Sequence, residues 1–168
     1  MGIFNKIFDK KKSDRNHMES TDPIFIDNEL GYFSLDRESN CFQGKIDWMD
    51  SKCDVQLRIE PGETEIAQGV VDILIKLHNY ANEWDLKVRK FAAKKLTELA
   101  NDWQSDIDID SKEITKEEFE KRISLYAICI DADGELEFYF DDGDMFAGHT
   151  IIVYGNISGE LECAEIGG

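Results

Sequence analysis

The spacing of hydrophobic residues changes twice along the chain, and this pattern restricts the folds that the chain can adopt. Before residue 60, apolar side chains recur at every second position, as in Val55, Leu57 and Ile59, which is typical of strands with one solvent-exposed face. Between residues 66 and 103 they recur with helical spacing. After residue 122 the alternation returns. Strands, helices and strands again predict an α+β fold.

The patterns also predict the individual elements. An N-terminal meander of strands is broken by turn-like residues at 36–40 and 49–52. Apolar stripes at 66–81 and 88–103 predict two antiparallel helices, and Thr115 followed by Glu118 fits a capping box that opens a short third helix. Four further strands are expected at 123–130, 135–140, 149–155 and 160–166. We therefore expect a largely antiparallel sheet, built from an N-terminal and a C-terminal meander, with all the helices packed on one face.

The length of 168 residues suits one domain. Residues 1–12 form a short amphipathic basic segment, and the polar residues 13–22 lack any periodicity and read as a flexible linker. The domain is then expected to comprise residues 23–168.

The net charge of the chain argues against one class of function. The chain has 36 acidic and 19 basic residues, a formal net charge of −17, which would repel a phosphate backbone and argues against nucleic-acid binding. The excess lies mainly in residues 105–168, which hold 17 acidic and 4 basic residues. No secretory signal pattern occurs, and Cys41, Cys53, Cys129 and Cys163 show no paired spacing. These features favour a cytoplasmic protein with reduced thiols.

The segment 141–149 is the strongest candidate for a functional site. It brings Asp141, Asp142, Asp144 and His149 together with two glycines, and carboxylates this close need a compensating cation, a basic side chain, backbone donors or a raised pKa. Oxygen ligands would favour magnesium, calcium or manganese, while the imidazole would admit zinc or iron. We therefore consider these four residues candidate ligands of a divalent cation. Alternatively, the aspartates cap backbone amides and the histidine makes a hydrogen bond within the loop.

A second candidate is the N-terminal segment. It carries an apolar stripe and a basic cluster that could touch an anionic membrane surface weakly: Ile3, Phe4, Ile7, Phe8, Lys10, Lys11 and Lys12. The alternatives are a frayed tail or a helix docked on its own domain.

The C-terminal half resembles a known family. EITKEEF from residue 113, ELEFYFDDGDMFAGHTIIV from residue 135 and the closing GELECAEIGG are similar to an uncharacterised bacterial family, the domain-of-unknown-function family twenty-two sixty-two. The resemblance extends from about residue 30 to the end. It implies a bacterial protein, and it brings no activity, cofactor or catalytic residue with it.

Two functions are consistent with these observations. The first is a non-enzymatic acidic binding module for a protein partner; an analogy of charge with small proteins that neutralise basic toxins would make that partner basic. The alternative is a divalent-metal-dependent enzyme, a hydrolase, that uses the 141–149 loop. The sequence defines no required cofactor beyond the candidate cation, and it does not define the oligomeric state.

Overall fold

The computed structural model describes residues 25–59, 64–107 and 112–168. Eight strands form one sheet in the order β1 to β8. The strands are β1 (Phe25–Asn28), β2 (Gly31–Asp36), β3 (Cys41–Trp48), β4 (Ser51–Arg58), β5 (Ser124–Asp131), β6 (Glu135–Asp141), β7 (Thr150–Asn156) and β8 (Leu161–Gly167). The helices are α1 (Thr64–Asn79), α2 (Ala81–Ile107) and α3 (Lys116–Arg122). The predicted α+β class, with helices between two groups of strands, is confirmed.

The sheet consists of two antiparallel meanders joined by one parallel pair of strands. Neighbouring strands are antiparallel throughout, apart from β4 and β5. In that pair Val55 lies opposite Ile128 and Arg58 opposite Asp131. The three helices therefore form the crossover that a parallel pair requires.

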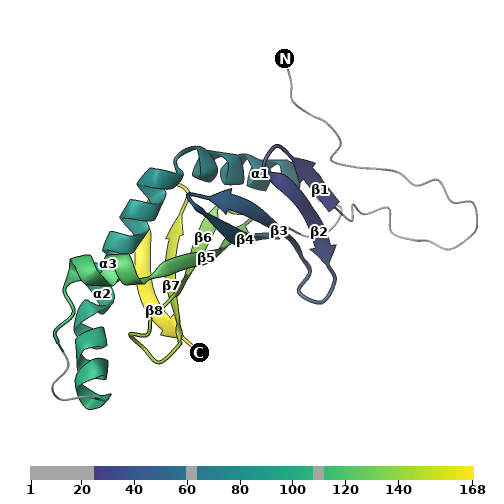
Figure 1. Ribbon diagram of the computed structural model, residues 1–168. Coiled ribbons are helices and arrows are strands. Elements are labelled where there is room, and N and C mark those ends of the chain that lie inside the picture. The colour runs from purple at the N-terminus through teal and green to yellow at the C-terminus, as the bar shows by residue number, and fades with distance from the viewer. Residues whose placement is uncertain (1–24, 60–63, 108–111) are drawn as a thin grey trace, which may run out of the picture.

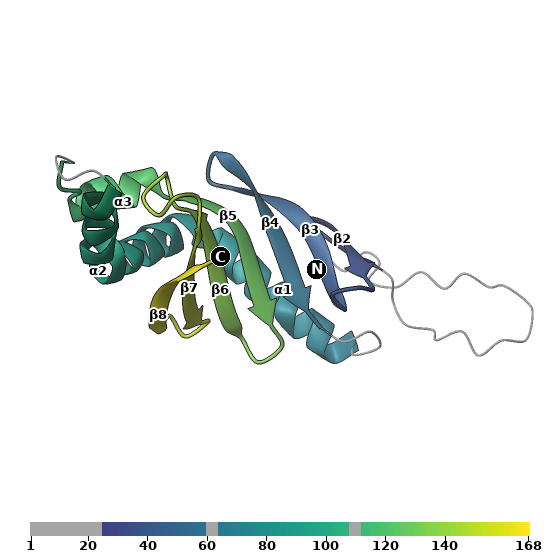
Figure 2. The ribbon, with the colours of Figure 1, turned by 90° about the horizontal axis from the view of Figure 1, so that it is seen from below.

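The helices lie on one side of the sheet. Seen from below, the strands stand in front of α1 (Figure 2). Only Tyr80 separates α1 from α2, and α2 continues along the arch that α1 begins (Figure 1). The two helices thus differ from the antiparallel pair that we expected, because a single intervening residue leaves no room for a chain reversal and each helix packs on the sheet instead.

The core lies between the helices and the sheet. Along β4, Cys53, Val55 and Leu57 are fully buried, whereas Asp54 and Gln56 point to the opposite face. The largest fully buried side chains include Trp48, Phe33, Phe42, Phe119, Phe138, Phe140 and Phe146. Two members of the predicted helical stripes, Ile66 and Leu99, are instead 38% and 43% exposed. We call the face of the sheet away from the helices the open face.

The predicted N-terminal segment 1–12, with its candidate contact residues, and the predicted linker 13–22 lie outside the described residues. Within the described part of the chain, no helix is both long and apolar enough to cross a membrane.

Candidate functional site

The loop that follows β6 is anchored on α2. Met145 and Phe146 are completely buried. The Phe146 ring meets Trp103 of α2 edge to face, with centroids 5.8 Å apart. From the next residue of α2, the side-chain amide of Gln104 donates to the carbonyl oxygen of Met145 at 3.1 Å. The loop is therefore a packed part of the core and not a free surface loop.

Asp142 fixes the course of this loop. Asp142 is only 2% exposed. Oδ1 accepts a hydrogen bond from the backbone N–H of Asp144 at 3.0 Å. Oδ2 accepts from the N–H groups of Phe146 and Gly148 at 2.7 and 3.0 Å. Three backbone donors thus compensate the buried carboxylate, as the capping alternative proposes.

The other three predicted ligands have different surroundings. Asp141 and Asp144 are exposed, and Asp141 accepts a hydrogen bond from the N–H of Gly143 at 2.9 Å. His149 donates from Nδ1 to the carbonyl of Phe146 at 2.5 Å. In the described residues, no group of three or more His, Cys, Asp or Glu side chains is placed to hold a metal ion. Metal binding at the loop stays a prediction, which thermal shifts with Mg²⁺, Ca²⁺, Mn²⁺ and Zn²⁺ would test.

Gly143 lets the loop approach α3. Its φ is +55°, and a Cβ atom there would lie 2.5 Å from the carbonyl oxygen of Arg122. The Gly143 carbonyl in turn accepts hydrogen bonds from Nε and a terminal nitrogen of Arg122, at 3.1 and 2.6 Å. Both the conformation and the close contact require glycine.

An ion-pair cluster lies on the open face, between β4, β5 and β6. The guanidinium of Arg58 donates two hydrogen bonds to Glu137, at 2.8 and 2.7 Å, and one to Asp131 at 3.1 Å. The hydroxyl of Tyr139 also donates to Glu137. No sequence motif marks this cluster, because Arg58 is far in sequence from its partners on β5 and β6. The one signal in the sequence was that each residue occupies an alternate position of its strand, where side chains point away from the core.

The cluster has fixed protonation states at neutral pH. Burial of Glu137 acts to raise its pKa, but the hydrogen bonds from Arg58 and Tyr139 outweigh it, and the pKa is lowered. Hydrogen bonding to Glu137 raises the pKa of Arg58. Burial raises the pKa of the neighbouring thiol of Cys129 to about 11. The carboxylate therefore stays charged, and the thiol stays protonated and poorly nucleophilic.

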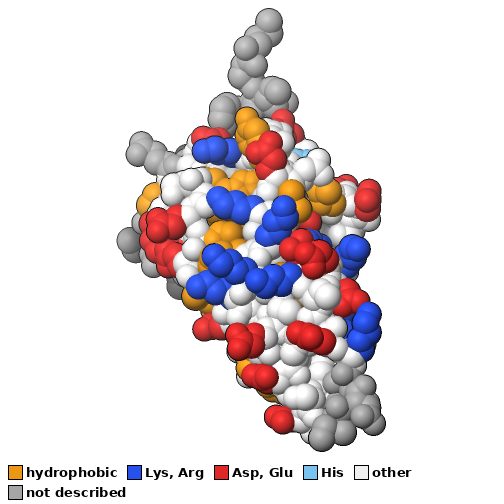
Figure 3. Space-filling model, turned by 90° about the vertical axis from the view of Figure 1, so that its left-hand side faces the viewer, with side chains coloured by type: hydrophobic (Ala, Val, Ile, Leu, Met, Phe, Trp, Pro, Cys, Tyr) orange, Lys and Arg blue, Asp and Glu red, His pale blue; other side chains and the backbone are white. Residues whose placement is uncertain are grey.

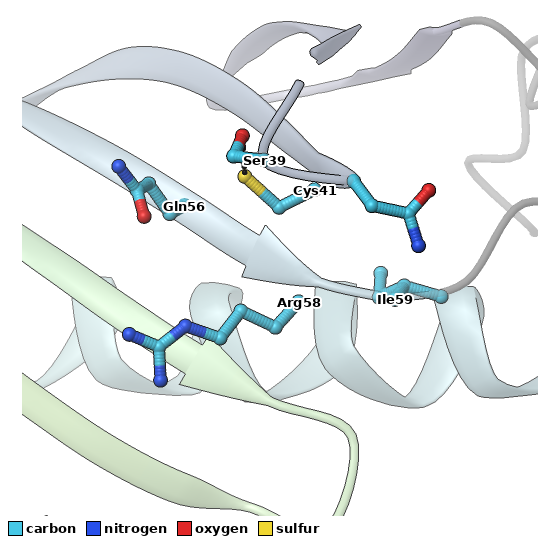
Figure 4. A pocket seen from close by; sticks show the side chains of 6 residues that line it. Ser39, Cys41, Gln56, Arg58 and Ile59 are labelled. Atoms are coloured by element: carbon cyan, nitrogen blue, oxygen red, sulfur yellow. Dashed lines mark hydrogen bonds between the residues drawn. The ribbon is translucent and has the colours of Figure 1, made fainter. Parts of the chain in front are cut away.

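A hollow of about 460 Å³ opens beside this cluster, at the turn between β2 and β3. In Figure 4, Ser39 and Cys41 face Gln56 across it, and the Arg58 side chain extends over β5. The lining residues are Ser39, Asn40, Cys41, Gln56, Arg58 and Ile59. Polar and apolar groups share this lining equally, and its amide, hydroxyl and guanidinium groups could pair with a polar group of a partner.

Carboxylates and tyrosines dominate the open face over the C-terminal meander. Residues 124–168 contain ten acidic residues and neither lysine nor arginine. We call the carboxylates on the open side of β5, β6 and β8 the acidic face: Asp131, Glu135, Glu137, Asp141 and Glu165. A β-bulge at Tyr126 places its ring beside Tyr139, with centroids 6.4 Å apart. The Tyr154 hydroxyl donates to Glu165 at 3.0 Å.

The N-terminal meander differs, because the lysines on the open side of β3 and β4 are each paired with an aspartate of the neighbouring strand. Lys45 contacts Asp54 at 2.5 Å, and Lys52 contacts Asp47 at 2.6 Å. Both pairs join residues directly opposite each other on β3 and β4. The negative field of the open face is therefore concentrated over β5 to β8.

The chain belongs to a bacterial family. The model of the family described as uncharacterised protein conserved in bacteria, DUF2262, matches residues 27–166. This match runs from the middle of β1 to all but the last residue of β8 and includes all three helices, and it confirms the resemblance seen in the sequence. No curated protein and no solved structure matches the chain.

Proposed function

We propose that this chain is a non-enzymatic binding module and that the acidic face docks a basic protein partner. The observation that carries the proposal is the absence of any lysine or arginine from residues 124–168, together with their ten acidic residues. The strand alternation gathers five of those carboxylates on the face that α1, α2 and α3 leave uncovered. A complementary charge on the partner would speed association and select against acidic proteins.

The tyrosines of the same face supply contact area. Tyr126 is 40% exposed, and Tyr139 and Tyr154 are half-buried beside the carboxylates. Tyrosine is enriched in protein interfaces because its ring packs while its hydroxyl stays hydrogen-bonded. Arg58 holds two of the carboxylates in place, so the partner would meet a surface that is already ordered.

The proposal includes a cellular location for the interaction. All four cysteines are free thiols, which supports a cytoplasmic location. Within the cytoplasm, a small acidic protein could neutralise a basic toxin in the manner of an immunity protein. This final step rests on an analogy of charge.

Affinity capture with the full chain tests the proposal. The native chain, immobilised and exposed to bacterial lysate, should retain a basic protein that moderate salt releases. The paired substitutions Glu135→Lys and Glu165→Lys should lower the affinity for the identified and purified protein by about tenfold or more. Glu113→Lys with Glu117→Lys makes the same charge change at exposed positions outside the sheet and should leave binding intact. Equal loss in both pairs, or in neither, would contradict the acidic face as the docking surface.

A further inference from the structure

The outer side of α2 carries the opposite charge to the acidic face. Residues 86–97 contain five basic residues and no acidic one, in a chain whose net charge is −17. Figure 3 shows Lys and Arg side chains gathered across the middle of the side on which the helices lie. Arg89 turns inward, where it pairs with Asp85 and donates to the carbonyl of Glu120. We call the remaining four the basic stripe: Lys87, Lys90, Lys94 and Lys95.

The basic stripe is exposed and poorly neutralised. Lys87 lies over the ring of Trp84, and Lys95 lies over the ring of Phe91, each with Nζ 5.5 Å from the centroid. Lys90 and Lys94 are exposed and have no ionic partner within the ranges that the structure describes. Two uncompensated cations on successive turns of one helix mark a surface suited to anionic groups.

We infer that the basic stripe of one copy docks on the acidic face of a second copy. The inference rests on the proposed function, since it uses the same face. Successive turns of α2 place its lysines over a span of about 10 Å. On the acidic face, the carboxylates of β6 and β8 are two strands apart, about 10 Å across the sheet, and Glu135 lies a further four positions along the strands from Glu165, about 13 Å. The two charged surfaces therefore match in sign, and the acidic face is broad enough to accept the whole stripe.

The positions of the two surfaces determine the kind of assembly. The basic stripe lies on the helical side and the acidic face on the opposite side of the sheet, so each docked copy still offers one surface of each kind. Such a head-to-tail contact forms rings or open chains of molecules. At physiological ionic strength, charges more than about 8 Å apart are screened, so the contacting charges outweigh the repulsion between two acidic chains.

Sedimentation velocity of the full chain over a range of protein concentrations tests the inference. In 0.15 M salt the native chain should form larger species as its concentration rises, and 1 M salt should dissociate them. Lys90→Glu with Lys94→Glu should weaken association by about tenfold or more, and so should Glu135→Lys with Glu165→Lys. Lys116→Glu with Lys121→Glu, on α3, makes the same charge change as the stripe pair and should not weaken association.

The decisive experiment mixes the two weakened variants in equal amounts. Each altered surface then meets its opposite on the other variant, so association should return. A native chain that stays monomeric at every concentration, or a mixture that fails to associate, overturns the inference. If the chain is monomeric and binds phosphatidylglycerol vesicles through these lysines, the basic stripe is a membrane-binding surface. That result would also overturn the inference. If the native chain is monomeric yet captures a basic protein through Glu135 and Glu165, only the proposed function survives.

Discussion

At the scale of single residues, Asp142 shows how one buried carboxylate can organise a loop. It accepts three backbone hydrogen bonds from a segment whose next residues, Met145 and Phe146, enter the core. The charge that the sequence suggested for metal binding is thus used to hold the chain itself. The loop owes its shape to this acceptor as much as to its glycines.

Removing that acceptor should be costly. Asp142→Ala leaves three amides without their partner, and we expect a loss of about 3 kcal/mol in the free energy of unfolding, measured by urea denaturation. Asp141→Ala, which removes an exposed acceptor of a single bond, should cost less than about 1 kcal/mol. Similar losses for the two variants would show that the buried carboxylate does not hold the loop.

The Glu137 carboxylate should make stability depend on pH. Its pKa in the folded protein lies below the ordinary 4.5, so its contribution is complete above about pH 4.5 and is lost as the pH falls through the lowered value. Between pH 5.5 and 7, we expect the free energy of unfolding of the native protein to exceed that of Glu137→Gln by about 1 to 3 kcal/mol. That difference should shrink below pH 4.5. Glu135→Gln, at an exposed position, serves as the control, and a difference independent of pH would exclude this role.

The sequence could indicate some of these residues and not others. Asp142 stood out because several carboxylates crowd one short segment, although nothing local distinguished backbone capping from a metal site. Arg58 and Glu137 are separated by 79 positions, and their contact follows only from the placement of β4 beside β5. Leu99 fits the apolar stripe of its helix yet is exposed, because the periodicity of a helix does not reveal where its packing partner ends.

At the scale of elements, local signals were reliable where the stabilising contacts are local. The capping box predicted from Thr115 and Glu118 is present, with both reciprocal hydrogen bonds formed. The four strands expected after residue 122 also form, and the hairpins at Gly134 and Gly159 each place a glycine with positive φ between them. By contrast, the course of α2 after α1 depends on long-range packing against the sheet, so the helical pattern could not define it.

The capping box offers a test at this scale. Thr115→Ala removes the hydroxyl that accepts from the N–H of Glu118 at 3.2 Å, and we expect the free energy of unfolding to fall by about 1 kcal/mol. Thr115→Ser keeps the acceptor and should cost only a small part of that. Urea denaturation of both variants measures the effect. A loss from serine as large as that from alanine would mean that the methyl group, and not the cap, stabilises α3.

A second element-scale test concerns the attachment of α3 to α2. Arg89 of α2 contacts Asp85 and donates to the carbonyls of Glu120 and Ile123 at the end of α3. Arg89→Ala should reduce the free energy of unfolding by about 2 kcal/mol, since two partly buried carbonyls lose a charged donor. Arg89→Lys keeps a charged donor and should therefore lose less of the free energy of unfolding than Arg89→Ala. Hydrogen exchange should show the loss first in α3, and uniform loss over the sheet would contradict a local role.

At the scale of the whole molecule, the net charge of −17 opposes the compact state. Raising the salt concentration from about 10 to 150 mM should increase the free energy of unfolding by on the order of 1 kcal/mol, because screening weakens this self-repulsion. Urea midpoints at both salt concentrations provide the measurement. The increase should be smaller in Glu135→Lys with Glu165→Lys, which removes four units of negative charge. A midpoint that falls with salt would show that attractive ion pairs dominate instead.

The parallel pairing of β4 with β5 also affects how a newly made copy matures on the ribosome. β1 to β4 can pair as soon as they emerge, but β4 keeps a bare edge until β5 has been translated, because Arg58 and Asp131 are 73 positions apart. At ordinary translation rates this delay lasts roughly 4 to 15 s. Unpaired edges join readily with other strands. Nascent chains on the same messenger RNA therefore have several seconds in which their incomplete sheets can associate through these edges.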